Sequence, residues 1–231
     1  MIREAHFTAP GPKVADRIAD ALRSEILGGI LPPGRRLREE HLAERFGASR
    51  HTVRSALAVL TADRLLTAAP YQGARVTVFD DEQLLALQDL RRALECEAVR
   101  MICKRNGGVV WSDDDLIPIM ATVDELTRAE ATMPQDWIGV ERAHAAVHLS
   151  IVERAGSARI TEAHRAIGDE LSLLLLHTRP LYAMNELSEQ HLALIEDVQR
   201  RGEAAIREHL ADSTARLLAQ RAADHEVRPR R

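Results

Sequence analysis

The fold is decided by residues 37–60, which read LREEHLAERFGASRHTVRSALAVL. A short helix is predicted over residues 38–46, Gly47 breaks it, and Ser49 is placed to cap a second helix over residues 50–63. The apolar positions of this second helix share one arc and must face a core: they are Val53, Ala56, Leu57 and Leu60. Two helices joined by a tight glycine turn, the second with polar residues at its start, are typical of a helix-turn-helix.

The flanking residues extend this motif on both sides. An amphipathic helix is predicted over residues 13–27, and the Pro-Gly turn at residues 31–34 prevents its continuation. After the motif, residues 65–67 and 74–78 read as two short strands around a turn at residues 69–73. The strands predict a β-hairpin wing, so this part of the chain is interpreted as a winged helix-turn-helix.

Such a domain binds DNA with the second helix of the motif, here residues 50–63, in the major groove and with its wing at the minor groove or the backbone. The start of that helix carries Arg50 and Arg54, which can bond to guanine O6 and N7 or to a phosphate. The residues expected to contact DNA are Arg36, Ser49, Arg50, His51, Thr52, Arg54, Gln72 and Gly73. The alternative is a compact helical domain with a solvated charged face, which spacing alone leaves open.

The charge distribution agrees with DNA contact at one end of the chain. Residues 1–79 hold 12 Lys and Arg against 8 Asp and Glu, whereas residues 80–231 hold 19 against 27, so a basic head precedes an acidic body. These ranges are the two expected domains.

No run of about eighteen apolar residues and no signal peptide is evident, so a cytoplasmic protein without a membrane segment is expected. Cys96 and Cys103 form neither a disulfide framework nor a metal-binding pair.

The second domain is predicted to be an all-α bundle. Apolar residues at helical spacing mark six stretches, separated by Gly- or Pro-containing breaks. The stretches are residues 84–102, 116–126, 140–152, 160–175, 187–198 and 206–217. The whole chain is therefore mainly α, with its only predicted strands in the wing.

The first domain strongly resembles the winged-helix domain of the GntR family of bacterial regulators. The matching motifs are Pro33-Gly34-x-x-Leu37, Leu42-Ala43-Glu44, Gly47-x-Ser49-Arg50 and Val53-Arg54-x-Ala56-Leu57. The family's wing commonly carries Arg-Gly or His-Gly, where this chain has Gln72-Gly73, and the family's frequent Thr-Pro is His51-Thr52 here. The resemblance implies DNA binding as a homodimer on a palindromic operator, while the second departure leaves the operator sequence open.

The second domain resembles the ligand-sensing domain of the FadR branch of that family, the FCD type. The residues that carry this resemblance are Arg91-Arg92-x-Leu94-Glu95, His148 with Ala155-Gly156, Glu189-x-His191 and Glu208-His209-Leu210. In many relatives an Asp and three His hold a divalent metal at the floor of the effector pocket.

Carried over by position, the resemblance gives His148, His191 and His209 as metal ligands. The position of the Asp, four residues before His148, is His144 here, and residues four apart share a helix face. Loss of that negative charge favours Zn²⁺ or Ni²⁺ over hard ions. His191 and His209 are about one helical turn closer in sequence than in relatives, so the register of His209 is open. The alternative for each histidine is a hydrogen-bonded core residue.

The family resemblance implies a small carboxylate as the effector. Arg91 or Arg92 could bond to this anion, or one of them could pair with Glu95 at helical spacing and be structural. The expected function is a DNA-binding transcriptional regulator whose operator affinity depends on the effector. The alternatives are a direct metal sensor and, less favoured, a metal-dependent enzyme. Catalysis is not expected, because Glu141 and Glu153 are interpreted as lying off the His144/His148 face.

Overall fold

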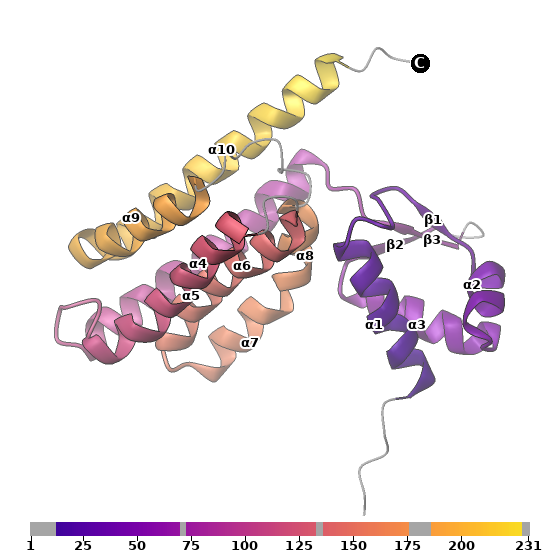
Figure 1. The fold of residues 1–231 in the computed structure, drawn as a ribbon, viewed down its shortest axis with the longest axis horizontal. Helices are drawn as coiled ribbons and strands as arrows, with labels where there is room; N and C mark the ends of the chain where they lie inside the picture. Colours follow the sequence, from indigo (N-terminus) through magenta and orange to yellow (C-terminus); the bar gives the residue numbers. More distant parts are fainter. Residues whose placement is uncertain (1–12, 70–72, 133–135, 176–185, 228–231) are drawn as a thin grey trace, which may run out of the picture. The chain divides into compact units, whose positions relative to one another are not determined.

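The computed structural model describes residues 13–69, 73–132, 136–175 and 186–227 (Figure 1). The chain divides into two compact units, residues 1–78 and 79–231. The first unit is a winged helix-turn-helix and the second is a helical bundle, so the predicted fold class is confirmed.

The first unit contains three helices and a small antiparallel sheet in its described part. The helices are α1 (Val14–Leu27), α2 (Glu39–Phe46) and α3 (Arg50–Ala62), and the strands are β1 (Arg36–Leu37), β2 (Leu66–Ala69) and β3 (Gly73–Val76). The order of the strands in the sheet is β1-β3-β2.

Local chemistry sets the bounds of α2 and α3 where the sequence predicts them. Gly47 ends α2 in the left-handed conformation, with φ 59°, which glycine adopts at no steric cost. Ser49 caps α3, because its side chain accepts a hydrogen bond from the backbone N–H of Thr52 at 3.1 Å. The apolar arc of α3 is buried as expected.

The wing differs from the predicted two-stranded hairpin, because β1 adds a third strand. Arg36 lies opposite Arg75 and Leu37 opposite Ala74. The turn after α1 sets this pairing: the Gly34 N–H donates to the Val76 carbonyl at 2.9 Å, and the Val76 N–H donates to the Arg35 carbonyl at 3.0 Å. A strand of two residues is too short to show a period of two, so the sequence pattern does not reveal it.

The second unit is helical throughout its described part. Its helices are α4 (Asp81–Arg105), α5 (Asp113–Thr132), α6 (Trp137–Arg154), α7 (Ala158–Ala166), α8 (Gly168–Leu175), α9 (Glu186–Arg201) and α10 (Glu203–Val227). The sequence predicts one helix over residues 160–175, whereas the structure has two. The chain breaks at Ile167 and Gly168, and glycine is a poor residue for continuing a helix.

The core of this unit holds the histidine-bearing helices in place. Helix α5 packs on α6 and α9, and α10 packs along α4 and α9 (Figure 1). Fully buried residues come from these helices, among them Ile102, Ile119, Leu126, Ile151, Val198 and Ile206. None of the described helices combines the length and the apolar character that a membrane span requires.

Candidate nucleic-acid interface and histidine cluster

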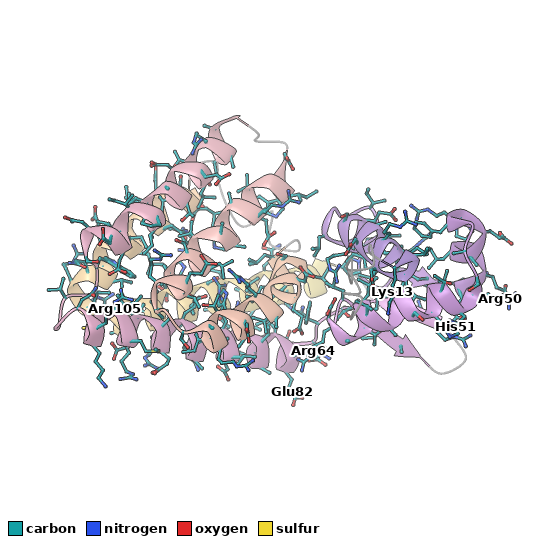
Figure 2. All side chains as sticks on the ribbon, turned by 90° about the horizontal axis from the view of Figure 1, so that it is seen from below. Lys13, Arg50, His51, Arg64, Glu82 and Arg105 are labelled. Atoms are coloured by element: carbon teal, nitrogen blue, oxygen red, sulfur yellow. The ribbon has the colours of Figure 1, made fainter. Side chains whose placement is uncertain are left out.

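The start of α3 presents its polar side chains to solvent. Arg50 and His51 project outward from this helix (Figure 2), and Arg54, one turn further on, is exposed as well. Ser49 and Thr52 are differently placed, since their hydroxyls bond to each other at 2.8 Å and Ser49 serves as the helix cap. The arginines are therefore the long, accessible donors of this surface.

Both arginines are paired with carboxylates at the start of α2. Arg54 makes a two-pronged contact with Glu39, through Nε at 2.9 Å and Nη2 at 2.7 Å, and Arg50 Nη2 lies 2.9 Å from Glu40. The hydrogen bond with Arg54 lowers the pKa of Glu39, and the same bond raises the pKa of Arg54. Glu39 and Glu40 could not be recognised as partners of these arginines from sequence spacing, because Arg54 and Arg50 are distant from them in the chain.

A groove of about 820 Å³ joins these residues to the wing. It is lined by Arg36, Arg38, Arg50 and Arg54, and by Gly73 of β3. Gly73 has φ 78°, and a Cβ there would lie 2.8 Å from the Leu37 carbonyl oxygen, so the position requires glycine. Gln72 lies outside the described residues. The groove thus combines a basic wall with one edge of the wing.

Four histidines from three helices meet inside the second unit. His144 and His148 are one turn apart on α6, and their candidate ligand atoms and those of His191 on α9 all lie within 4.8 Å of one another. His209 of α10 stands beside this group, with its ring centroid 5.0 Å from that of His191. The shorter spacing between His191 and His209 therefore still brings the two rings together.

The hydrogen bonds of His148 and His191 determine which ring nitrogens carry protons. Nδ1 of His148 lies 2.9 Å from Oε2 of Glu95, and Nδ1 of His191 lies 2.7 Å from the Leu187 carbonyl oxygen. Because carbonyl and carboxylate oxygens only accept, both Nδ1 atoms must donate. In the neutral rings each Nε2 then carries a lone pair, and these two Nε2 atoms are 2.9 Å apart. Facing lone pairs repel each other unless a proton or a cation lies between them.

The histidines are held neutral by their surroundings. Burial lowers the pKa of His144 and His191 well below the usual value and lowers the pKa of His209 to about 3. Burial and the nearby Arg91 lower the pKa of His148. A neutral imidazole is the form that binds a metal ion, so the cluster is competent as a ligand set near neutral pH.

Glu95 connects the histidines to α4. Arg91 Nε donates to its Oε1 at 2.7 Å, and His164 Nε2 donates to the same oxygen at 3.2 Å. Although burial opposes ionisation, His148 and Arg91 hold the pKa of Glu95 well below its usual range. Arg91 is thus buried in the helical pair with Glu95 that the structural alternative describes, and it also lines the α6–α8 cavity described below. Arg92 pairs with Asp89 at the surface, at 2.7 Å, and does not line the cavities described below.

Two cavities adjoin the cluster, and His144 lines both. The α6–α8 cavity measures about 300 Å³ and is also lined by Arg91, Glu141, His148 and His164. The α9–α10 cavity measures about 470 Å³ and is also lined by His191, His209, Arg201 and Arg216. The histidines thus stand at the edge of spaces large enough for a small ligand.

The placement of Glu141 corrects an expectation from the sequence. Glu141 lies on the cavity-facing side of α6 with His144 and His148, because intervals of three and seven residues return to one helix face. Burial raises the pKa of Glu141 to about 7. Glu153, by contrast, pairs with Arg165. Glu141 therefore lies on the His144/His148 face, and the expectation that it lies off this face was wrong.

A winged helix-turn-helix joined to a helical unit defines a class of protein, the DNA-binding transcriptional regulators. Residues 14–76 match the family of bacterial regulatory proteins called the gntR family, and residues 86–213 match the FCD domain. The chain belongs to the GntR family and has the FadR-type FCD domain at its C-terminal side. It is a transcriptional regulator of the GntR/FCD type.

Individual relatives agree with this assignment. BphR of Paraburkholderia xenovorans, an uncharacterized HTH-type transcriptional regulator, is 30% identical over 180 residues, which cover 75% of this chain and 71% of BphR. The HTH-type transcriptional repressor GlaR of Escherichia coli is 29% identical over 64% of this chain and 66% of GlaR. A solved GntR regulator structure from Rhodococcus sp. RHA1 superposes with a TM-score of 0.71 at 25% identity, covering 89% of this chain and 97% of that one.

Proposed function

We propose that this regulator binds a divalent metal ion at His144, His148 and His191, with His209 beside them, and that a small carboxylate bound there changes its affinity for operator DNA. The pair of Nε2 atoms of His148 and His191 carries this proposal. Their lone pairs face each other at 2.9 Å, and each opposite ring nitrogen is fixed by an acceptor. A carboxylate or carbonyl behind a histidine is the usual outer support of a metal ligand.

The donor set supports a particular kind of ion. Buried neutral imidazoles suit Zn²⁺ and Ni²⁺ better than Mg²⁺ or Ca²⁺, which prefer oxygen ligands. When bound, the ion supplies positive charge to which the effector's carboxylate can bind. Glu95 orients His148, and the Leu187 carbonyl orients His191, so the chain itself sets the direction of both ring nitrogens.

At the other end of the chain, the basic groove is the surface for operator DNA. Arg50 and Arg54 would leave Glu40 and Glu39, or share their donors with them, to reach guanine or phosphate oxygens. A homodimer would place two such helices on the half-sites of a palindrome. Effector binding and DNA binding must then affect each other by the same factor, usually about 5- to 150-fold.

Fluorescence anisotropy with DNA from upstream of the protein's own gene tests this function. The wild-type chain should bind the duplex, and Arg54→Ala should weaken binding without unfolding the protein. Failure of the folded wild type to bind would contradict the proposal. Repeating the titration with Zn²⁺ alone separates a fixed metal from a direct metal sensor: only a sensor would respond strongly to the ion without any carboxylate.

A further inference from the structure

One buried polar atom on the wall of the α6–α8 cavity lacks a hydrogen-bond partner among the described residues. It is Oε1 of Glu141, whose residue is only 5% exposed. A buried carboxyl oxygen left unpaired is costly, so such an atom usually indicates a donor that belongs to water or to a ligand.

Apart from the exposed Arg142, the other polar and charged side chains discussed below on this wall have protein partners. Arg91, His148 and His164 all contact Glu95. Arg165 pairs with Glu153. Much of the remaining wall is apolar, contributed by Ala145, Ala146, Leu149, Leu171 and Leu175. A ligand in this cavity therefore meets apolar side chains, the histidine cluster at His144 and His148, the charge of Arg142, and the acceptor on Glu141.

We propose that Glu141 selects an effector that carries a hydroxyl group besides its carboxylate, with the hydroxyl donating a hydrogen bond to Oε1 of Glu141. This inference rests on the proposed function, because the carboxylate end is assigned to the histidine cluster. Glu141 and His144 are one turn apart on α6 and line the same cavity, so one small molecule there can contact both side chains. The cavity of about 300 Å³ fits a compact hydroxycarboxylate.

A hydroxyl matches this position better than an ammonium group does. Burial raises the pKa of Glu141 to about 7 in the metal-free chain, and a cation bound at the nearby histidines would lower it again, so the carboxyl can be neutral or ionised depending on metal loading. A hydroxyl both donates and accepts, and it can therefore pair with either form. An ammonium group only donates, and it loses strong hydration on entering an apolar cavity unless it meets a full negative charge.

Matched acids test the inference directly. Calorimetry would use the full-length, Zn²⁺-loaded chain with propionate, lactate and alanine, and then with succinate, malate and aspartate. Within each series the skeleton is constant and only the substituent changes. In at least one series the hydroxy acid should bind about tenfold or more tightly than its parent acid, since sites built to bond a hydroxyl discriminate strongly against its absence.

Two variants make the assignment specific to Glu141. Glu141→Met keeps the side-chain length but removes the acceptor, so the preference for the hydroxy acid should fall to about twofold while the parent acid still binds. Glu162, on α7 and outside the cavity, pairs with Arg159 at the surface, and Glu162→Gln should keep the full preference. The parent acid also reports whether the Met variant is folded.

The outcomes separate this inference from the proposed function. Three results would overturn the role of Glu141 but leave the proposed function standing. They are equal binding of hydroxy and parent acids, a preference for the hydroxy acid that survives in Glu141→Met, and tightest binding by an amino acid. Absence of binding by every acid to the metal-loaded chain would overturn the proposed carboxylate effector together with it.

Discussion

Replacement of Glu95 by Gln should destabilise the second unit strongly. Glu95 is fully buried and is the acceptor for Arg91, His148 and His164. The variant leaves the Arg91 guanidinium, itself only 3% exposed, without a compensating charge. Breaking a buried ion pair in this way costs about 3–5 kcal/mol. For a chain of this size the cost corresponds to a fall of about 6–20 °C in the unfolding temperature.

Tryptophan fluorescence is the appropriate assay for this variant. The chain's two tryptophans, Trp111 and Trp137, both lie in the second unit, so thermal unfolding followed by their emission reports on that unit alone. Glu97→Gln is the matched control, because Glu97 is on the same helix but pairs with Arg100 at the surface. The control should shift the midpoint by about 2 °C or less.

An additional variant separates the buried charge from packing. In Arg91→Met/Glu95→Gln the guanidinium that Glu95→Gln leaves unpaired is removed as well, and stability should recover much of the loss, since the uncompensated buried charge is what makes breaking such a pair costly. A midpoint for Glu95→Gln within about 2 °C of the wild type would show that the buried Arg91 does not need Glu95 as its counter-charge.

Three further predictions concern Arg54 in operator binding, Asp115 in acid stability, and Glu95 in metal binding. Arg54→Ala should weaken operator binding about tenfold and reduce its salt dependence, whereas Arg159→Ala, on the second unit, should change neither in the same anisotropy assay. The contacts of Asp115 with Ser112 and Asn106 outweigh its burial and lower its pKa to about 2. Because this folded pKa is depressed, the stabilisation is complete above the unfolded pKa of about 3.9 and is lost as pH falls toward 2. The free energy of unfolding of the wild type should therefore decline between pH 5 and pH 2. In Asp115→Asn this decline should be smaller by about 2 kcal/mol, as measured by urea unfolding at each pH. Glu95→Gln should also weaken Zn²⁺ binding about 10- to 100-fold in calorimetry, because His148 loses the carboxylate that orients it; unchanged Zn²⁺ affinity would argue against that role.

Local sequence signals account for the parts of the fold that could be predicted. Gly47 and Ser49 end one helix and begin the next through their own backbone and side chain, so residues 39–62 follow from sequence alone. By contrast, β1 exists only because the turn at Gly34 delivers two residues to β3. The break at Ile167 and Gly168 was missed because the apolar period continues across it.

The histidine site, too, could be predicted from the sequence only in part. The family resemblance indicated the four histidines, but their convergence depends on how α6, α9 and α10 pack. Helical spacing of three and seven residues was enough to place Glu141 on their face, and that signal was misread. The contact of His164 with Glu95 joins residues 69 positions apart, which no local pattern reveals.

The most direct test of the account is a Zn²⁺ titration of the metal-free full-length chain at pH 7 by calorimetry, in parallel with a His148→Ala/His191→Ala variant. The wild type should bind one ion per chain and the variant should lose that binding, with tryptophan-monitored unfolding confirming that the variant is folded. Binding of the same stoichiometry and affinity by wild type and variant, or no binding by the wild type, would contradict a metal centre at the facing ring nitrogens.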